Sequence, residues 1–373
     1  MNIAVSTTSL LLTLLALEVG LRLYGYNPLG DWQSDNEYIL RASTYPDLKY
    51  ELTPGASGSL SDTDIKINSQ GFRGPEPSSS PSGQRVVVLG DSIAFGNFMP
   101  WEDTFSNQMQ QRLHSENRDV EVLNFGVGGY DTLQEVSLLE IRGLKYHPDL
   151  VVVAYCLNDI SIASTSLEHI ERRRSQQRSF LYRSRLAQFV STNIEKIRLK
   201  NWLSHMNQPE IFHREYERQI DEISEDEVEL LNLMKNAPRW PSTTWYGDRD
   251  RVGRLRFAFS RLASISREND FPVVIVIVPL LVGDAGTYTH RTAHRIVEME
   301  ARRAGFDTID LTDAFMRAGV GTLKTDFGDI IHPNKRGHTI MANLLSEYVV
   351  SHLKELPIAS KVNRPQKQNI PSP

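Results

Sequence analysis

The chain has 373 residues, of which 40% are hydrophobic and 23% charged, so it can bury a full core and is not a disordered protein. Its 41 Lys and Arg residues stand against 46 Asp and Glu residues. The formal net charge of −5 gives no support for a general nucleic-acid binder, and we expect no nucleic-acid partner. Cys156 is the only cysteine, which excludes an internal disulfide and any multi-cysteine metal site.

The N-terminal stretch is apolar. Residues 3–24 are interrupted only by hydroxyl side chains, Glu18 and Arg22, and the run is about long enough to cross a bilayer. Glu18 and Arg22 can pair on one face of a helix. Because no Lys or Arg precedes the run, it lacks a normal signal-peptide start. We therefore expect residues 1–26 to be an uncleaved membrane anchor that holds the rest of the chain outside the cytoplasm, in the periplasm or on the cell surface. A cleaved signal segment, which would give a secreted protein, and a buried amphipathic helix are the alternatives.

Residues 27–84 form an accessory segment that is rich in Ser, Gly, Pro and Asp. Short strands are predicted around Lys49–Leu52 and Ile65–Asn68, and Pro54-Gly and Gly71-Phe-Arg-Gly are turn signals. We expect this segment to lie against the main domain, and its composition indicates no function.

From Arg85 onward, strand and helix patterns alternate, as in a doubly wound parallel sheet. Apolar runs without alternation predict strands that are covered on both faces. These strands are expected at 85–90, 120–124, 149–155, 272–278 and 307–310. Helices are expected at about 103–116, 132–145, 248–268 and 335–354. We therefore predict an α/β domain over 85–355: three layers, flavodoxin-like, with a five-stranded parallel sheet and helices on both faces.

Residues 161–250, between the third and fourth strands, break this alternation. The pattern is helical and charged, with a basic part from Arg172 to Arg185 and an acidic part from Glu215 to Glu229. A helical insertion after the carboxyl end of a strand can act as a lid or a substrate platform. A solvated surface subdomain with paired charges, or a basic patch that meets anionic lipid or polysaccharide, are the alternatives. Residues 356–373 are predicted to be a disordered tail.

One hydroxyl follows the first predicted strand. Gly90-Asp91-Ser92 places Ser92 at the carboxyl end of that strand and at the start of a helix. In open α/β sheets ligands bind at this edge, so Ser92 is a candidate nucleophile. An ordinary turn or a helix cap is the alternative for this tripeptide.

Potential donors for a negative charge follow the next two strands. Asn124-Phe-Gly-Val-Gly-Gly-Tyr130 can point backbone N–H groups into a cleft, where they could hold an oxyanion or a phosphate. A plain flexible turn is the alternative, and the spacing misses the dinucleotide fingerprint. Asn158 offers a side-chain N–H₂ donor, with a turn or capping role as its alternative.

A carboxylate and an imidazole lie near the C-terminus. Asp329 can accept a hydrogen bond from Nδ1–H of His332, which leaves Nε2 free to take a proton. A surface turn is the alternative when these two residues are considered alone. His338 is a less attractive base because it lies on the following helix.

These four stretches, in the order in which they follow one another along the chain, resemble the four blocks of the SGNH/GDSL hydrolase family. The resemblance covers about residues 85–159 and 307–350. The resemblance implies a Ser-His-Asp triad of Ser92, His332 and Asp329. It also implies an oxyanion hole made by the amides of Ser92 and Gly129 and by the Asn158 side chain. The apolar N-terminus followed by Gly71-Phe-Arg-Gly is similar to bacterial, membrane-anchored members.

The chain departs from the family pattern at two places. The first block continues Ser-Ile-Ala in place of Ser-Leu, a change that concerns packing. The third block has Cys156 where the family usually has Gly, so Cys156 either lines the pocket or is a small buried side chain at a strand end. Asp91 and Asp159 are expected to be structural.

The resemblance implies a serine esterase or acyl hydrolase that needs no metal or organic cofactor. Its expected substrate is an ester on a glycan or a lipid, such as an O-acetyl group on a polysaccharide. An O-acyltransferase that uses the same site is one alternative. A noncatalytic glycan-binding module is another, although the intact triad argues against it. A nucleotide-binding protein that uses Gly126–Gly129 as a phosphate loop lacks the Lys-Ser/Thr pattern.

Overall fold

The computed structural model describes residues 2–24, 39–45, 47–60, 63–79, 83–160, 245–325 and 329–353, with isolated residues between 184 and 234. The prediction of a disordered tail over 356–373 lies outside the described residues. The prediction of a helical insertion lies mostly outside them as well.

A five-stranded, all-parallel sheet forms the centre of the fold, in the order β6-β5-β7-β8-β9. Its strands are β5 (Gln84–Gly90), β6 (Val120–Asn124), β7 (Leu150–Cys156), β8 (Val273–Val278) and β9 (Asp307–Asp310). Every residue of β7 and β8 is buried, as expected for strands that are covered on both faces. The predicted doubly wound fold is confirmed. Each predicted strand agrees with the observed one to within one residue at either end.

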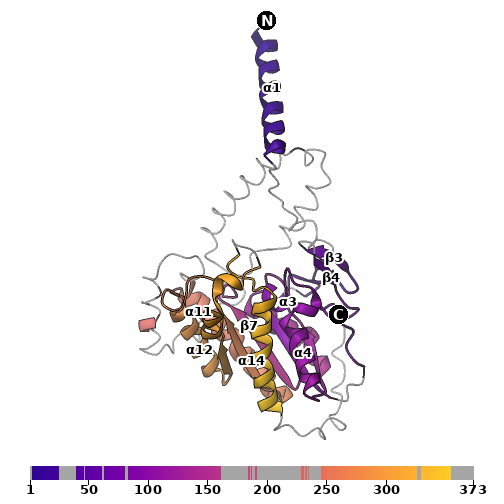
Figure 1. Ribbon diagram of the computed structural model, residues 1–373, viewed down its shortest axis with the longest axis vertical. Helices are drawn as coiled ribbons and strands as arrows, with labels where there is room; N and C mark the ends of the chain where they lie inside the picture. Colours follow the sequence, from indigo (N-terminus) through magenta and orange to yellow (C-terminus); the bar gives the residue numbers. More distant parts are fainter. Residues whose placement is uncertain are drawn as a thin grey trace.

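Two groups of helices cover the sheet (Figure 1). One group is formed by α4 (Phe105–Ser115), α13 (Thr312–Ala318) and α14 (Lys335–Leu353). The other contains α5 (Thr132–Leu138), α11 (Arg249–Asn269) and α12 (Arg291–Arg303). Because β6 and β7 lie on opposite sides of β5, right-handed crossovers place the connecting helices on opposite faces.

The helix predictions hold at α4, α11 and α14, but not in two other places. The predicted helix over 132–145 is α5 followed by a π-helical turn (Leu139–Gly143) and a 3-10 turn (Leu144–Tyr146). The spacing of apolar residues cannot distinguish these hydrogen-bonding patterns from a continuous α-helix. Helices α12 and α13 are not among the predicted elements, although α12 has an apolar face on which Ala293, Ile296, Val297 and Ala301 are buried.

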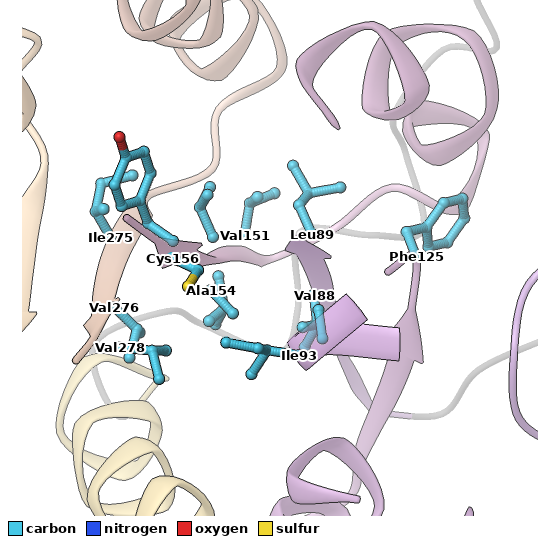
Figure 2. Packing of buried hydrophobic residues seen from close by; sticks show 14 of the residues in the cluster. Val88, Leu89, Ile93, Phe125, Val151, Ala154, Cys156, Ile275, Val276 and Val278 are labelled. Carbon is cyan, nitrogen blue, oxygen red and sulfur yellow. The ribbon is translucent and has the colours of Figure 1, made fainter. Parts of the chain in front are cut away.

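The core lies along β5, β7 and β8, and short helix α3 (Ser92–Phe95) packs into it. Figure 2 shows Ile93 of α3 beside Val88 and Ala154, with Cys156 among the apolar side chains of the neighbouring strand. The helix that carries Ser92 therefore rests directly on the sheet.

The accessory segment contains two antiparallel pairs. β1 (Leu40–Ala42) pairs with β2 (Tyr50–Leu52), and β3 (Ser57–Leu60) pairs with β4 (Thr63–Lys66). β2 matches the strand predicted at Lys49–Leu52, whereas β4 shares only Ile65 and Lys66 with the strand predicted at Ile65–Asn68, and β1 and β3 are not among the predicted strands. Phe72 stacks on Phe125 beyond β6, with ring centroids 4.7 Å apart, and buried side chains of the segment share one core with the sheet.

Helix α1 (Asn2–Leu23) contains the expected pair between Glu18 and Arg22, at 2.7 Å. Among the helices that the structure describes, none combines the length and the apolar character needed to cross a membrane. The membrane anchor expected in residues 1–26 stays a prediction. The extracytoplasmic location stays a prediction.

Candidate active site

The turn between β5 and α3 depends on a glycine. Gly90 has φ +147°, and a Cβ atom there would lie 2.8 Å from the carbonyl oxygen of Ala154 on β7. A side chain at this position would therefore be both strained and obstructed. The chain turns sharply from strand to helix, and Ser92 becomes the first residue of α3.

Ser92 lies beside the predicted imidazole and carboxylate. Its Oγ is 2.9 Å from Nε2 of His332, and Nδ1 of His332 is 2.8 Å from Oδ2 of Asp329. The imidazole and carboxylate side chains are only 15% and 18% exposed. The structure thus brings together three residues from opposite ends of the domain, in the order that proton transfer from a serine hydroxyl requires.

The Asp329 carboxylate is held by its own loop. Oδ1 accepts hydrogen bonds from the backbone N–H groups of Ile331 and His332, at 2.8 and 3.0 Å, and the Thr325 hydroxyl donates to Oδ2 at 2.9 Å. Burial raises the pKa of Asp329, but the hydrogen bond and charge of His332, with the backbone bonds, outweigh this and hold the pKa below its usual value. The carboxylate therefore stays ionised and favours the Nδ1–H tautomer of His332.

Asn158 follows β7, the strand beside β5 at the point where the strand order reverses. Its Nδ2 donates to Oδ2 of Asp91 at 3.1 Å. An amide nitrogen carries two N–H groups, so one remains for a ligand. Asp91 also accepts from the backbone N–H of Ile93 at 2.8 Å, and so caps α3. The predicted structural role of Asp91 thus links Asn158 to the helix of Ser92.

The glycine loop after β6 packs on the same helix. A Cβ atom at Gly126 would lie 2.2 Å from the backbone nitrogen of Phe95, so only glycine allows this approach. A Cβ atom at Gly128 would lie 3.9 Å from Cβ of Ser92. Gly129, the predicted oxyanion donor, follows directly and has φ +80°. The loop is therefore tightly docked next to Ser92 and is not a loose turn.

Two residues of the site were not identified from the sequence. Asn124 is fully buried, donates through Nδ2 to the carbonyl of Ala94 at 2.6 Å, and accepts from the N–H of Gly126 at 2.9 Å. It thereby ties the glycine loop to α3. The ring of Phe98 contacts the ring of His332 edge to face, with centroids 5.0 Å apart. In the sequence, only the aromatic character of Phe98 hints at this role, because its contact with His332 forms only when the chain folds.

Three other residues that the sequence singles out, Cys156, Asp159 and His338, are buried and support the fold. Cys156 is fully buried and burial raises the pKa of its thiol, so of the two interpretations the small buried side chain is the one observed. Asp159 accepts from the backbone N–H of Cys156 at 2.7 Å. His338 is buried, and its Nδ1 accepts from the N–H of Phe105 at 3.1 Å, which caps α4. Burial, with the charges of Arg73 and His332, lowers the pKa of His338 to about 3.

Comparison with known proteins gives likenesses to esterases. An arylesterase from Vibrio mimicus is 30% identical over 80 residues, which is 21% of this chain and 40% of that relative. The acetylxylan esterase Axe2 from Geobacillus stearothermophilus has a TM-score of 0.40 and 13% identity, over 76% of this chain and 100% of that one. The esterase EstA from Pseudoalteromonas sp. has a TM-score of 0.40 and 12% identity, over 73% of this chain and 100% of that one.

The comparison with models of protein families matches a longer part of the chain. The model of the GDSL-like lipase/acylhydrolase family matches residues 88–340, more than half of the chain. The matched range includes Ser92, Gly129, Asn158, Asp329 and His332. The chain therefore belongs to the GDSL-like lipase/acylhydrolase family.

Proposed function

We propose that the protein is a serine esterase or acyl hydrolase that cleaves carboxylic esters. The observation that carries this proposal is the continuous hydrogen-bonded series from Asp329 through His332 to Ser92, with distances of 2.8 and 2.9 Å. Its position at the carboxyl edge of the sheet, beside a docked glycine loop and an amide side chain, adds support.

In the proposed reaction, Oγ of Ser92 attacks the ester carbonyl carbon while Nε2 of His332 takes the hydroxyl proton. The carbonyl oxygen becomes an oxyanion that accepts hydrogen bonds from the N–H groups of Ser92 and Gly129 and from Nδ2 of Asn158. The tetrahedral intermediate then breaks its bond to the alcohol oxygen, which receives the proton from His332. Water, deprotonated by His332, then attacks the acyl carbon, and the bond to Oγ of Ser92 breaks as His332 returns the proton to Oγ, which releases the acid and restores the enzyme.

We propose an ester on a glycan or a lipid as the substrate, with a short acyl group such as acetyl. The support is the sequence resemblance, together with membership of an acylhydrolase family. Initial rates on p-nitrophenyl acetate, butyrate and octanoate, followed by acetate release from acetylated xylan, test this choice. A preference for octanoate would redirect the assignment towards long-chain lipid esters.

Labelling with a fluorophosphonate probe tests the mechanism, because the probe reacts with activated serines. We expect the purified full chain to be labelled, Ser92→Ala to be unlabelled with about 10⁶-fold lower turnover, and His332→Ala to be labelled much more slowly. His352→Ala is the matched control, since His352 lies at the far end of α14, stacked on Tyr348. Labelling of the Ser92→Ala variant would contradict the proposal.

A further inference from the structure

The accessory segment, which the sequence leaves without a role, contacts the glycine loop through a tyrosine. The hydroxyl of Tyr50 on β2 donates to the carbonyl oxygen of Gly128 at 2.9 Å. The two residues are 78 positions apart in the sequence. The Tyr50 side chain is buried, with 2% of the residue exposed, so the rest of the ring is held by packing.

The carbonyl of Gly128 and the N–H of Gly129 belong to one peptide unit. In a planar trans peptide these two groups point in opposite directions. A bond that fixes the carbonyl on the side of Tyr50 therefore also fixes the N–H on the other side. Gly128 lies on the Ser92 side of this loop, because a Cβ atom there would be 3.9 Å from Cβ of Ser92.

A peptide between two glycines needs such a contact. Without Cβ atoms, Gly128 and Gly129 can adopt backbone angles that other residues avoid, so the plane between them can rotate at little steric cost. A hydrogen bond accepted by the carbonyl also polarises the peptide and strengthens its N–H as a donor. A hydrogen bond to the Gly128 carbonyl can therefore affect both the direction and the strength of the Gly129 N–H as a donor.

Tyr50 itself is held in place by the loop that it contacts. The hydroxyl of Tyr130, at the end of the glycine loop, donates to the main-chain carbonyl of Tyr50. The two rings meet edge to face, with centroids 5.1 Å apart. The Gln134 side chain adds a bond of 2.8 Å to the carbonyl of Leu48. The two tyrosines thus tie the segments together in both directions. The Tyr50 hydroxyl bonds the main chain of the glycine loop, and the Tyr130 hydroxyl bonds the main chain of β2.

We propose that Tyr50 is a positioning residue for ester hydrolysis, which orients the Gly129 N–H of the oxyanion hole through the shared Gly128–Gly129 peptide. This inference rests on the proposed function. It makes the accessory segment a part of the catalytic apparatus, although none of its residues needs to touch the substrate.

The Tyr50→Phe variant tests the proposal, because it removes one hydroxyl and keeps the ring. With p-nitrophenyl acetate we expect kcat to fall about 3- to 10-fold with KM unchanged, since the donor acts mainly on the developing oxyanion. Counting active sites with the fluorophosphonate separates this effect from partial misfolding. The matched control is Tyr146→Phe, which removes a hydroxyl that bonds Gln70 of the same segment at 3.2 Å. It should keep the wild-type kcat.

A trifluoromethyl ketone inhibitor supplies a second readout that a purely structural role would not move. Oγ of Ser92 adds to its carbonyl carbon, the proton passes to His332, and the carbonyl oxygen becomes an oxyanion. In Tyr50→Phe its Ki should rise by about the same factor as kcat falls. If that variant does not fold, Tyr130→Phe, which releases the main chain of Tyr50, should show a smaller loss of the same kind.

A Tyr50→Phe variant with the kcat and Ki of the wild type would overturn the inference. If Tyr50→Phe does not fold, wild-type kcat and Ki in Tyr130→Phe would overturn it. Hydrolysis that survives in Ser92→Ala would instead overturn the proposed function, so the two failures are distinguishable.

Discussion

At the scale of single residues, the Asn158 amide is oriented by a carboxylate and not by the backbone. Its Nδ2 donates to Asp91 at 3.1 Å, while its Oδ1 is buried without a hydrogen-bond partner among the described residues. A buried hydrogen-bond acceptor without a partner reduces stability. An orientation of the amide that gave Oδ1 a donor would therefore be preferred if the fold allowed one. The arrangement indicates that the amide is placed for its N–H groups, as an oxyanion donor requires.

Removing this amide should slow the reaction without unfolding the protein. For Asn158→Ala we expect kcat to fall about 10²- to 10³-fold with little change in KM, because one donor to the oxyanion is lost. Steady-state kinetics on p-nitrophenyl acetate, with a melting curve to verify folding, measure this. Asn269→Ala is the control, since among the described residues that side chain bonds only the carbonyl of Ile265 at the end of α11, at 2.8 Å. Near-normal turnover in Asn158→Ala would remove Asn158 from the mechanism.

At the scale of elements, the short helix α3 is completed by an arginine from the accessory segment. Arg73 is 1% exposed, and its guanidinium donates to the carbonyls of Phe95, Gly96 and Met99, at 2.9, 2.6 and 2.5 Å. The last carbonyls of a helix have no donors within the helix, so this side chain supplies them. Burial lowers the pKa of Arg73 to about 10, partly offset by Glu102, and the group remains charged at neutral pH.

Substitution of this arginine should affect both stability and turnover. In Arg73→Met the carbonyls lose their donors, and we expect the free energy of unfolding to fall by about 2–4 kcal/mol. We also expect kcat to fall at least 10-fold, because α3 carries Ser92 and the loop to Met99 carries Phe98, which contacts His332. Urea unfolding and steady-state kinetics measure the two effects.

Two further variants make the Arg73 result specific. Arg73→Lys keeps the charge and one donor group, so it should recover part of both losses. Arg41→Met should reduce stability by only about 1 kcal/mol, because Arg41 is 45% exposed and its buried partner Glu51 keeps a second ion pair, with Arg142 at 3.0 Å. Equal losses of stability and kcat in Arg41→Met and Arg73→Met would show that any removed positive charge in the accessory segment has this effect, and that the bonds of Arg73 to α3 are not its cause.

How far the sequence predicts an element depends on the range of the interactions that define it. Strands β5 and β8 are predictable because their continuous apolar runs end at turn residues, which is a local pattern. The residues proposed for the triad and the oxyanion hole can be singled out because each stands in a short block, either just after β5, β6 or β7 or just before α14. Arg73 stands in the Gly71-Phe-Arg-Gly turn signal and Tyr50 in a predicted strand, but neither pattern indicates a role at the site. Their roles come from contacts with Phe95 and Gly128, 22 and 78 residues away, which only the folded chain reveals.

At the scale of the whole molecule, a buried carboxyl group on which the charge of Asp91 acts should shape the dependence of stability on pH. Glu135 on α5 is 1% exposed, and neither carboxylate oxygen has a hydrogen-bond partner among the described residues. Burial, then the charges of Asp91 and Asp131, raise the pKa of Glu135 well above its usual value. The pKa of Asp159 is raised by burial, by Asp91 and by Glu135 itself.

The sign of the effect follows from which state binds the proton. Above about pH 4.3 the unfolded chain releases the Glu135 proton, whereas the folded protein keeps it because its pKa is raised. The unfolded state then binds fewer protons than the folded one, so stability falls as pH rises towards the folded pKa. For one group the slope is at most about 1.4 kcal/mol per pH unit.

Glu135→Gln removes this proton exchange and keeps the size of the side chain. We therefore expect its free energy of unfolding, relative to wild type, to increase as pH rises from 5 to 8, by up to about 1.4 kcal/mol per unit. Urea unfolding at several pH values measures the difference. Glu140→Gln is the control for the loss of a carboxylate, since that side chain is 43% exposed and pairs with Arg261. A pH-dependent gain in Glu135→Gln no larger than in Glu140→Gln would mean that the folded protein ionises Glu135 as readily as the unfolded chain does, and that water reaches this buried carboxyl group.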